Sequence, residues 1–247
     1  MIIGGLVLVI AWYLLRLLAT RWRAARRLVE RLSPYTRRLH AWVLSAPATF
    51  GYVAVFTAFT LVQRSAPSEL VGLLTRLSST NLFELHRAPV RALAQSALWV
   101  ADGGWGLILY VVVFATVVAY AERRYGTPRI ILICVTGHVL GSILTARVEL
   151  WAIRTGRAPA ALALVIDVGV SYMMVAGCAA ALLVATGRFR LLIAAGLLVG
   201  VVLPMVGEHS IWNLGHLFAT LSGLSTAALT LAFARPRPAV PSADPLI

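Results

Sequence analysis

Residues 162–185 read LALVIDVGVSYMMVAGCAAALLVA, an apolar run interrupted by a single charged residue, Asp167. A helix needs about 20 mostly apolar residues to cross a hydrocarbon core of about 30 Å, so this run predicts a transmembrane helix. Six further apolar runs have comparable length, at 2–19, 41–63, 105–121, 130–146, 191–206 and 212–234. The sequence therefore predicts an all-α, polytopic membrane protein with seven spans.

The composition of the whole chain supports this fold class. Of its 247 residues, 60% are hydrophobic and only 13% are charged, whereas a soluble domain carries about 25% charged residues. These values exclude a water-soluble globular enzyme and a disordered protein. The two cysteines, Cys134 and Cys178, both lie in apolar runs, and no cluster of potential metal ligands is present. We therefore expect no disulfide framework, no metal site and no cofactor.

The net charge of +13 comes from 22 basic residues, all of them arginine. If the basic segment 21–38 faces the cytoplasm, fourteen arginines lie in cytoplasmic segments and seven in outer ones. Because cytoplasmic loops of membrane proteins carry an excess of basic residues, this bias predicts an outer N-terminus and a cytoplasmic C-terminus. We expect a multi-pass protein of a bacterial-type plasma membrane that binds no nucleic acid.

Three regions are predicted along the chain. Residues 1–40 form a transmembrane helix and a basic cytoplasmic segment, residues 41–234 a six-helix membrane core, and residues 235–247 a disordered cytoplasmic tail. In segment 21–38 the apolar residues recur at helical spacing among arginines, which favours a helix lying on anionic lipid headgroups; a charged linker is the alternative. The loop 64–104 contains short apolar stretches at 70–77 and 93–100 and the turn Asp102-Gly103-Gly104. It is either a half-inserted element or an extracellular cap.

Polar residues inside predicted spans are the best indications of function, because burying them in a membrane is costly. Under the predicted topology, spans 162–185 and 212–234 are parallel, and Ser171 and His216 both lie near their outer ends. A serine and a histidine at similar depth on neighbouring helices meet the requirement for a nucleophile and its base. Gly169, Ala219 and Gly223 would allow the two helices to pack closely.

Each of these polar residues also has a structural interpretation. Ser171 could bond back to a backbone carbonyl, and His216 could form an interhelical hydrogen bond. Asp167 could pair with an arginine of the outer loops, such as Arg154 or Arg157, or line a water-filled cavity. His138, within Gly137-His-x-x-Gly141, is expected to form a hydrogen bond at a tight helix crossing, and Glu122 to anchor the inner interface.

Three motifs, taken in order, resemble the rhomboid family of intramembrane serine proteases. Gly169-Val-Ser171 is similar to the Gly-x-Ser nucleophile motif of that family. His216 followed by Ala219 and Gly223 resembles its His-x-x-Gly-x-x-x-Gly helix, with alanine in place of the first glycine. Glu122-Arg-Arg-Tyr-Gly126 is similar to its Glu-x-x-x-Gly. The resemblance covers residues 41 to 234, so the helix at 2–19 is an addition to a rhomboid-like six-helix core.

The resemblance implies a serine–histidine dyad that cleaves transmembrane-helix proteins near the outer membrane face, without a cofactor. Ser171 would attack the scissile carbonyl, and His216 would take the serine proton and return it to the leaving amine.

Two features depart from the family pattern. Tyr172 stands where active members have glycine or alanine, and residues 99–112 lack the histidine and asparagine that donate to the oxyanion. Tyr110 or Trp105, with the backbone N–H of Ser171, could replace those donors.

Three functional hypotheses follow. The first is an active intramembrane serine protease, and the second a non-catalytic rhomboid-like protein that binds the transmembrane helices of client proteins. The third is a small transporter that uses Asp167, His138 and His216 as a proton or ion relay. We find no duplicated halves, which transporters often have.

Overall fold

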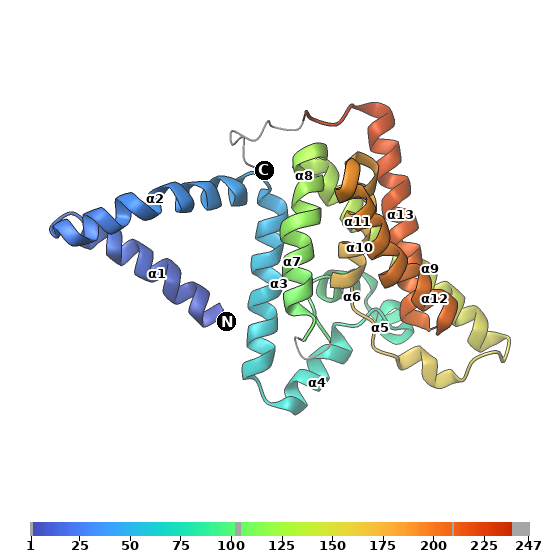
Figure 1. The fold of residues 1–247 in the computed structure, drawn as a ribbon. Helices are drawn as coiled ribbons and strands as arrows, with labels where there is room; N and C mark the ends of the chain where they lie inside the picture. Colours follow the sequence, from blue (N-terminus) through green and yellow to red (C-terminus); the bar gives the residue numbers. More distant parts are fainter. Residues whose placement is uncertain (1, 102–104, 209, 239–247) are drawn as a thin grey trace. The chain divides into compact units, whose positions relative to one another are not determined.

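The computed structural model describes residues 2–101, 105–208 and 210–238, and all regular secondary structure in this part is helical. Contacts divide the chain into two units, Met1–Ser45 and Ala46–Ile247. Unit 1 is a helical hairpin of α1 (Ile2–Leu18) and α2 (Arg23–Leu44) (Figure 1). The basic segment predicted at 21–38 is thus helical from Arg23 onward, and Pro34 is tolerated inside α2.

Unit 2 begins with α3 (Pro47–Ser65), which has Pro47 in its first turn, where a missing N–H costs nothing. The predicted span 41–63 is therefore wrong at its start, because residues 41–44 end α2. The loop 64–104 folds into α4 (Ser68–Leu77), α5 (Leu82–Arg87) and α6 (Pro89–Ser96). Asn81 caps α5 by accepting the Glu84 amide at 2.9 Å. The apolar stretch 93–100 is helical only to Ser96, and the predicted turn 102–104 lies outside the described residues.

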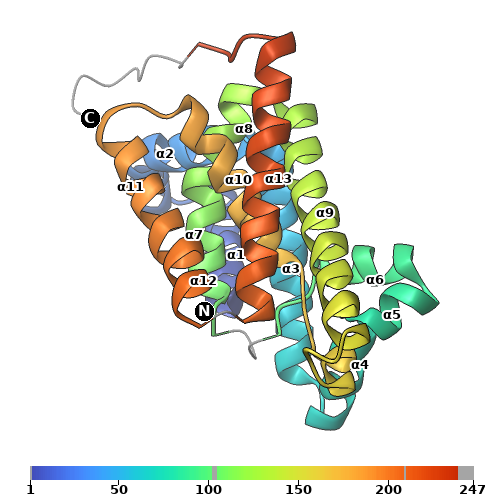
Figure 2. The same cartoon turned by 90° about the vertical axis from the view of Figure 1, so that its right-hand side faces the viewer.

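The remaining helices build the bundle. They are α7 (Leu107–Val113), the π-helical turn η1 (Phe114–Val118), α8 (Ala119–Tyr125), α9 (Thr127–Arg154), the 3₁₀ turn η2 (Ala160–Leu164), α10 (Val170–Val184), α11 (Gly187–Leu197), the π-helical turn η3 (Leu198–Val202), α12 (Leu203–Gly207) and α13 (Ile211–Phe233). In Figure 2, α9, α10 and α13 lie side by side at the centre of unit 2.

Three helical segments of the described chain are individually long and apolar enough to cross a membrane. They are α9, the continuous stretch Gly187–Gly207 that comprises α11, η3 and α12, and α13. The interior of the protein buries 50% of the apolar window in α9 but only 11% of that in Gly187–Gly207. The latter segment therefore presents most of its surface outward. The count of seven spans stays a prediction.

The predicted helix 162–185 is wrong in its first part, since α10 begins only at Val170. Before it, the backbone is held by the loop that carries α4 to α6. The Thr80 amide donates to the Asp167 carbonyl, and the Asp167 amide donates to Ser79 Oγ, both at 2.9 Å. The Gly169 amide donates to the Ser96 carbonyl, also at 2.9 Å. These long-range bonds replace the helical ones that periodicity alone predicts.

Small residues set the spacing of the three central helices. A methyl group at Gly137 of α9 would overlap Ala176 of α10, and one at Gly141 would come within 3.0 Å of Ala219 of α13. A methyl group at Gly223 of α13 would come within 2.6 Å of Ala176. The backbones can approach closely only because these positions carry glycine or alanine.

The chain turns sharply between α8 and α9 at Gly126, whose φ of 85° is rarely adopted by other residues. Residues 235–238 of the predicted disordered tail are described, and the Arg237 amide donates to the Arg124 carbonyl at 2.8 Å. Residues 239–247 lie outside the described part.

Candidate functional site between α9, α10 and α13

Ser171 is the second residue of α10 and is half-buried. Met174 follows Ser171 by three residues and therefore lies on the same face of α10. The Met174 side chain packs against a buried cluster that includes Val201 of η3. Within the described residues the Ser171 hydroxyl makes no hydrogen bond.

Tyr172 is fully buried and lies at the centre of the site. Its hydroxyl donates to Asp167 Oδ2 at 2.9 Å, and its ring meets the His216 ring edge to face, with centroids 5.1 Å apart and an interplanar angle of 87°. Gly215 of α13 leaves room for the hydroxyl, which a Cβ at that position would overlap. Tyr172 thus fills the space between the start of α10 and the start of α13.

His216 comes from the second turn of α13 and is half-buried. Its imidazole contacts the Tyr172 ring, and among the described residues no hydrogen bond joins it to Ser171. The site therefore brings both predicted dyad residues to the same end of two neighbouring helices, with a tyrosine ring against the histidine.

Asp167 lies just before α10 and is 9% exposed. Besides Tyr172, its carboxylate accepts a hydrogen bond from Thr80 Oγ1 at 3.1 Å. Neither of the predicted partners, Arg154 and Arg157, forms an ion pair with this carboxylate among the described residues, and the Arg157 guanidinium lies 4.3 Å from the centre of the Trp151 ring. The carboxylate is held by hydroxyl groups, not by a cation, in the described part of the chain.

His138 of α9 is 3% exposed and joins α9 to the loop before the bundle. Its Nε2 lies 3.0 Å from the Leu93 carbonyl and 3.3 Å from Ser96 Oγ. A bond to the carbonyl requires Nε2 to carry the proton. The ring lies against Gly169, where any Cβ would overlap it, so the Gly-x-Ser glycine is needed for close approach.

Glu122 of α8 is 1% exposed and accepts three hydrogen bonds. The donors are the amides of Ala48 at 3.0 Å and Thr49 at 2.8 Å, and the hydroxyl of Thr127 at 2.7 Å. The two amides belong to the first turn of α3, whose unpaired N–H groups favour a negative charge. Glu122 therefore ties α3 to the α8–α9 turn.

Trp105 and Tyr110, the residues suggested as replacement oxyanion donors, lie in different surroundings. Trp105 is 88% exposed and points away from the interior, while Tyr110 lies within α7. In the described residues no group of three or more His, Cys, Asp or Glu side chains could hold a metal ion.

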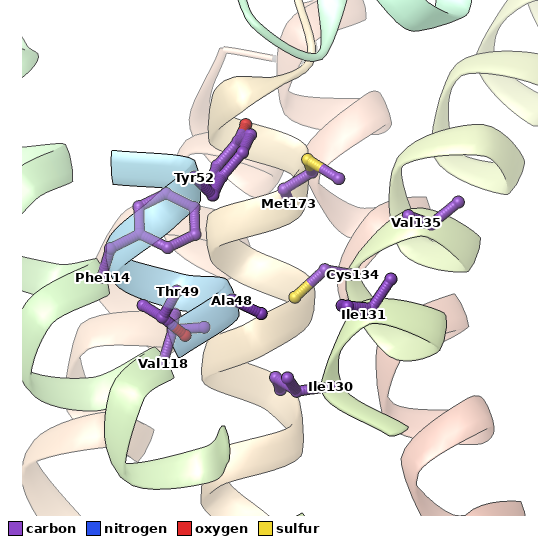
Figure 3. Close-up of a pocket in the computed structure, with 10 residues that line it drawn as sticks. All are labelled: Ala48, Thr49, Tyr52, Phe114, Val118, Ile130, Ile131, Cys134, Val135 and Met173. Atoms are coloured by element: carbon purple, nitrogen blue, oxygen red, sulfur yellow. The ribbon is translucent and has the colours of Figure 1, made fainter. Parts of the chain in front are cut away.

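An apolar pocket of about 150 Å³ lies on another side of α10 and is lined by residues of α3, η1, α9 and α10 (Figure 3). Met173 and Cys134 are among its lining side chains. Residues two apart on a helix project about 200° apart, so Ser171 does not share the direction of Met173. This pocket is thus separate from the polar site.

Sequence reasoning did not identify Thr80, Ser79 and Ser96 as part of the site. All three hold the residues that precede α10, from more than 70 positions away in the chain. In the sequence, these residues stood out only as polar residues within the long loop 64–104.

Residues 41–236 match a family model described as rhomboid-like protein. Searches of curated proteins and of solved structures returned no significant match.

Proposed function

The chain belongs to the rhomboid-like family, and from this premise we propose that it is a non-catalytic member that binds the transmembrane helices of client proteins. The arrangement of Tyr172 carries the proposal. In a working dyad the nucleophile and its base come within hydrogen-bond reach, about 2.6–3.2 Å. Here Tyr172 is buried against His216 and hydrogen-bonded to Asp167, and no hydrogen bond links His216 to Ser171 among the described residues.

The oxyanion position adds support. Residues 99–112 contain neither histidine nor asparagine, and Trp105 is exposed. Loss of one oxyanion donor lowers the rate of acyl transfer by about 100- to 1000-fold. Without these donors, and with no hydrogen bond between Ser171 and His216 in the described part of the chain, we expect little peptide-bond hydrolysis. The membrane fold does not depend on either feature.

The segment Gly187–Gly207 offers a surface for a client helix. Gly196 and Gly200 form a Gly-x-x-x-Gly pattern, and a Cβ at either position would meet no other atom within 4 Å. Leu192, Val199 and Leu203 are exposed, and each stands three or four residues from one of these glycines, the spacing of neighbours on one helix face. Small residues four apart allow another helix to approach closely in a membrane. We propose that client helices pack on this face of α11 and η3.

Site-directed photocrosslinking in native membranes tests the proposal. With a photoreactive phenylalanine at Val199, we expect the same crosslinked membrane proteins for the wild-type background and for Ser171→Ala. Gly196→Leu with Gly200→Leu should abolish these crosslinks, whereas Gly51→Leu, at an equally open position on α3, should preserve them. Crosslinks unaffected by the double glycine substitution, or formed only to a second copy of the chain, would contradict the proposal.

A second candidate function is the intramembrane serine protease that uses Ser171 and His216. It is favoured by the position of both residues near the N-terminal ends of two neighbouring helices, and by the Gly-x-Ser glycine against His138. Under this alternative, wild-type protein would shorten its crosslinked partners, and Ser171→Ala would leave them at full length.

We further propose that the protein is inserted with its N-terminus outside and its C-terminus in the cytoplasm of a bacterial-type plasma membrane. The excess of arginines in the segments assigned to the cytoplasm supports this orientation. Reporter fusions after residue 247 should be active only for a cytoplasmic reporter, and the opposite pattern would reverse the topology.

A further inference from the structure

The hairpin of unit 1 contains a cleft between its two helices. In Figure 1, α1 and α2 diverge from their connection. Residues of both helices line a cleft of about 760 Å³. Binding pockets for small molecules measure about 300–1,000 Å³. The cleft is thus large enough for a lipid headgroup and the adjoining parts of its acyl chains.

The lining of the cleft combines positive charge with apolar surface. Arg16 of α1 and Arg37 and His40 of α2 contribute the basic groups, while Trp12 and Val43 contribute apolar ones. Arg16 lies in the last turn of α1, where an arginine side chain can extend from an apolar helix toward the polar membrane interface.

Little in unit 1 can neutralise these arginines. Residues 1–45 contain eight arginines and one acidic residue, Glu30. In the described part of the chain, no carboxylate forms an ion pair with Arg16 or Arg37. Both side chains are exposed at the cleft and are available to an anion.

We propose that the cleft between α1 and α2 binds an anionic phospholipid. The guanidinium groups of Arg16 and Arg37 bind the phosphate oxygens, for which their geometry is well suited, and the acyl chains lie on Trp12 and Val43. A membrane lipid is the favoured source of the phosphate because the same cleft presents apolar surface, which a free phosphate would leave unused. The exposed apolar residues of α2, including Tyr35 (67%) and Leu39 (57%), suit a helix at the lipid interface.

Lipid titration of the purified full-length chain in detergent, followed by native mass spectrometry, tests the proposal. Wild type should bind phosphatidylglycerol more tightly than phosphatidylcholine, and inorganic phosphate should not displace it. An interfacial arginine contributes about fivefold to the affinity for anionic lipid, so Arg16→Gln with Arg37→Gln should weaken phosphatidylglycerol binding by about 25-fold.

Two matched variants make the test specific. Arg23→Gln with Arg27→Gln removes the same charge from positions of α2 that do not line the cleft, so the affinity should stay within about threefold of wild type. Arg16→Lys with Arg37→Lys keeps the charge and should retain most of the binding. The proposal is overturned by equal affinity for the two lipids, by equal losses in the two glutamine pairs, or by arginine-dependent binding of a single-stranded RNA without lipid preference.

Discussion

Replacing Gly223 with alanine tests the close packing of α10 and α13 on which the site depends. The new Cβ would lie 2.6 Å from Ala176 Cα, 2.7 Å from its Cβ and 2.9 Å from its carbonyl oxygen. Carbon atoms in favourable contact are about 3.5–4.0 Å apart, so α13 must move away from α10 by about 1 Å. Overpacking of this kind costs about 1–3 kcal/mol, and alanine in a helix recovers about 0.5–1 kcal/mol. The net expected loss is about 0–2.5 kcal/mol.

Gly51→Ala on α3 is the matched control, because nothing lies within 4 Å of its added Cβ. There only the gain in helix propensity applies, and stability should rise by about 0.5–1 kcal/mol. Both variants can be compared with wild type by reversible unfolding of the purified protein in mixed micelles, followed by circular dichroism and tryptophan fluorescence. If Gly223→Ala proves as stable as Gly51→Ala, α10 and α13 do not pack as described, and the contact between Tyr172 and His216 loses its basis.

Three further substitutions should affect the same unfolding measurement. Tyr172→Phe should cost about 1–3 kcal/mol because a buried carboxylate loses a hydrogen-bond donor, while Tyr35→Phe, at an exposed ring, should change nothing measurable. Glu122→Ala leaves two backbone amides of α3 without their acceptor and should cost at least about 2 kcal/mol; an unchanged stability would refute the anchoring role. Gly169→Ala should destabilise by about 1–3 kcal/mol, and adding His138→Ala should recover part of that loss because the overlapping ring is removed; additive losses would refute the contact.

Helices with strong local signals could be predicted from the sequence. Pro47 in the first turn of α3 is a clear start signal, although hydropathy placed the predicted start at 41, and Ser210, which accepts the Asn213 amide at 3.3 Å, precedes α13, predicted from 212. The apolar lengths of α9 and α13 are equally clear, although α9 continues eight residues beyond the predicted end at 146. There the buried Glu149 breaks the apolar pattern but not the helix.

The start of α10 could not be predicted in this way. Residues 162–169 are apolar enough for a helix, but Ser79, Thr80 and Ser96 bind their backbone in another conformation. The same long-range contacts decide the partners of Asp167. Hydropathy measures only how apolar a segment is, so it cannot reveal hydrogen bonds that arise after distant segments pack.

The role of Tyr172 was accessible from the sequence only as a departure from a family pattern. That the ring lies against His216 depends on the space that Gly215 leaves on α13, 43 positions later in the chain. The Gly-x-x-x-Gly pattern at Gly196 and Gly200 was not identified from the sequence, and its exposure is evident only in the fold.

Labelling of the purified, folded full-length protein with a serine-directed fluorophosphonate probe tests the proposal of a non-catalytic member most directly. We predict that wild type is labelled no more than Ser171→Ala, because no hydrogen bond links His216 to the serine among the described residues. Labelling of wild type that is lost in Ser171→Ala and in His216→Ala, and kept in the control Ser222→Ala, would contradict the proposal and establish a working dyad.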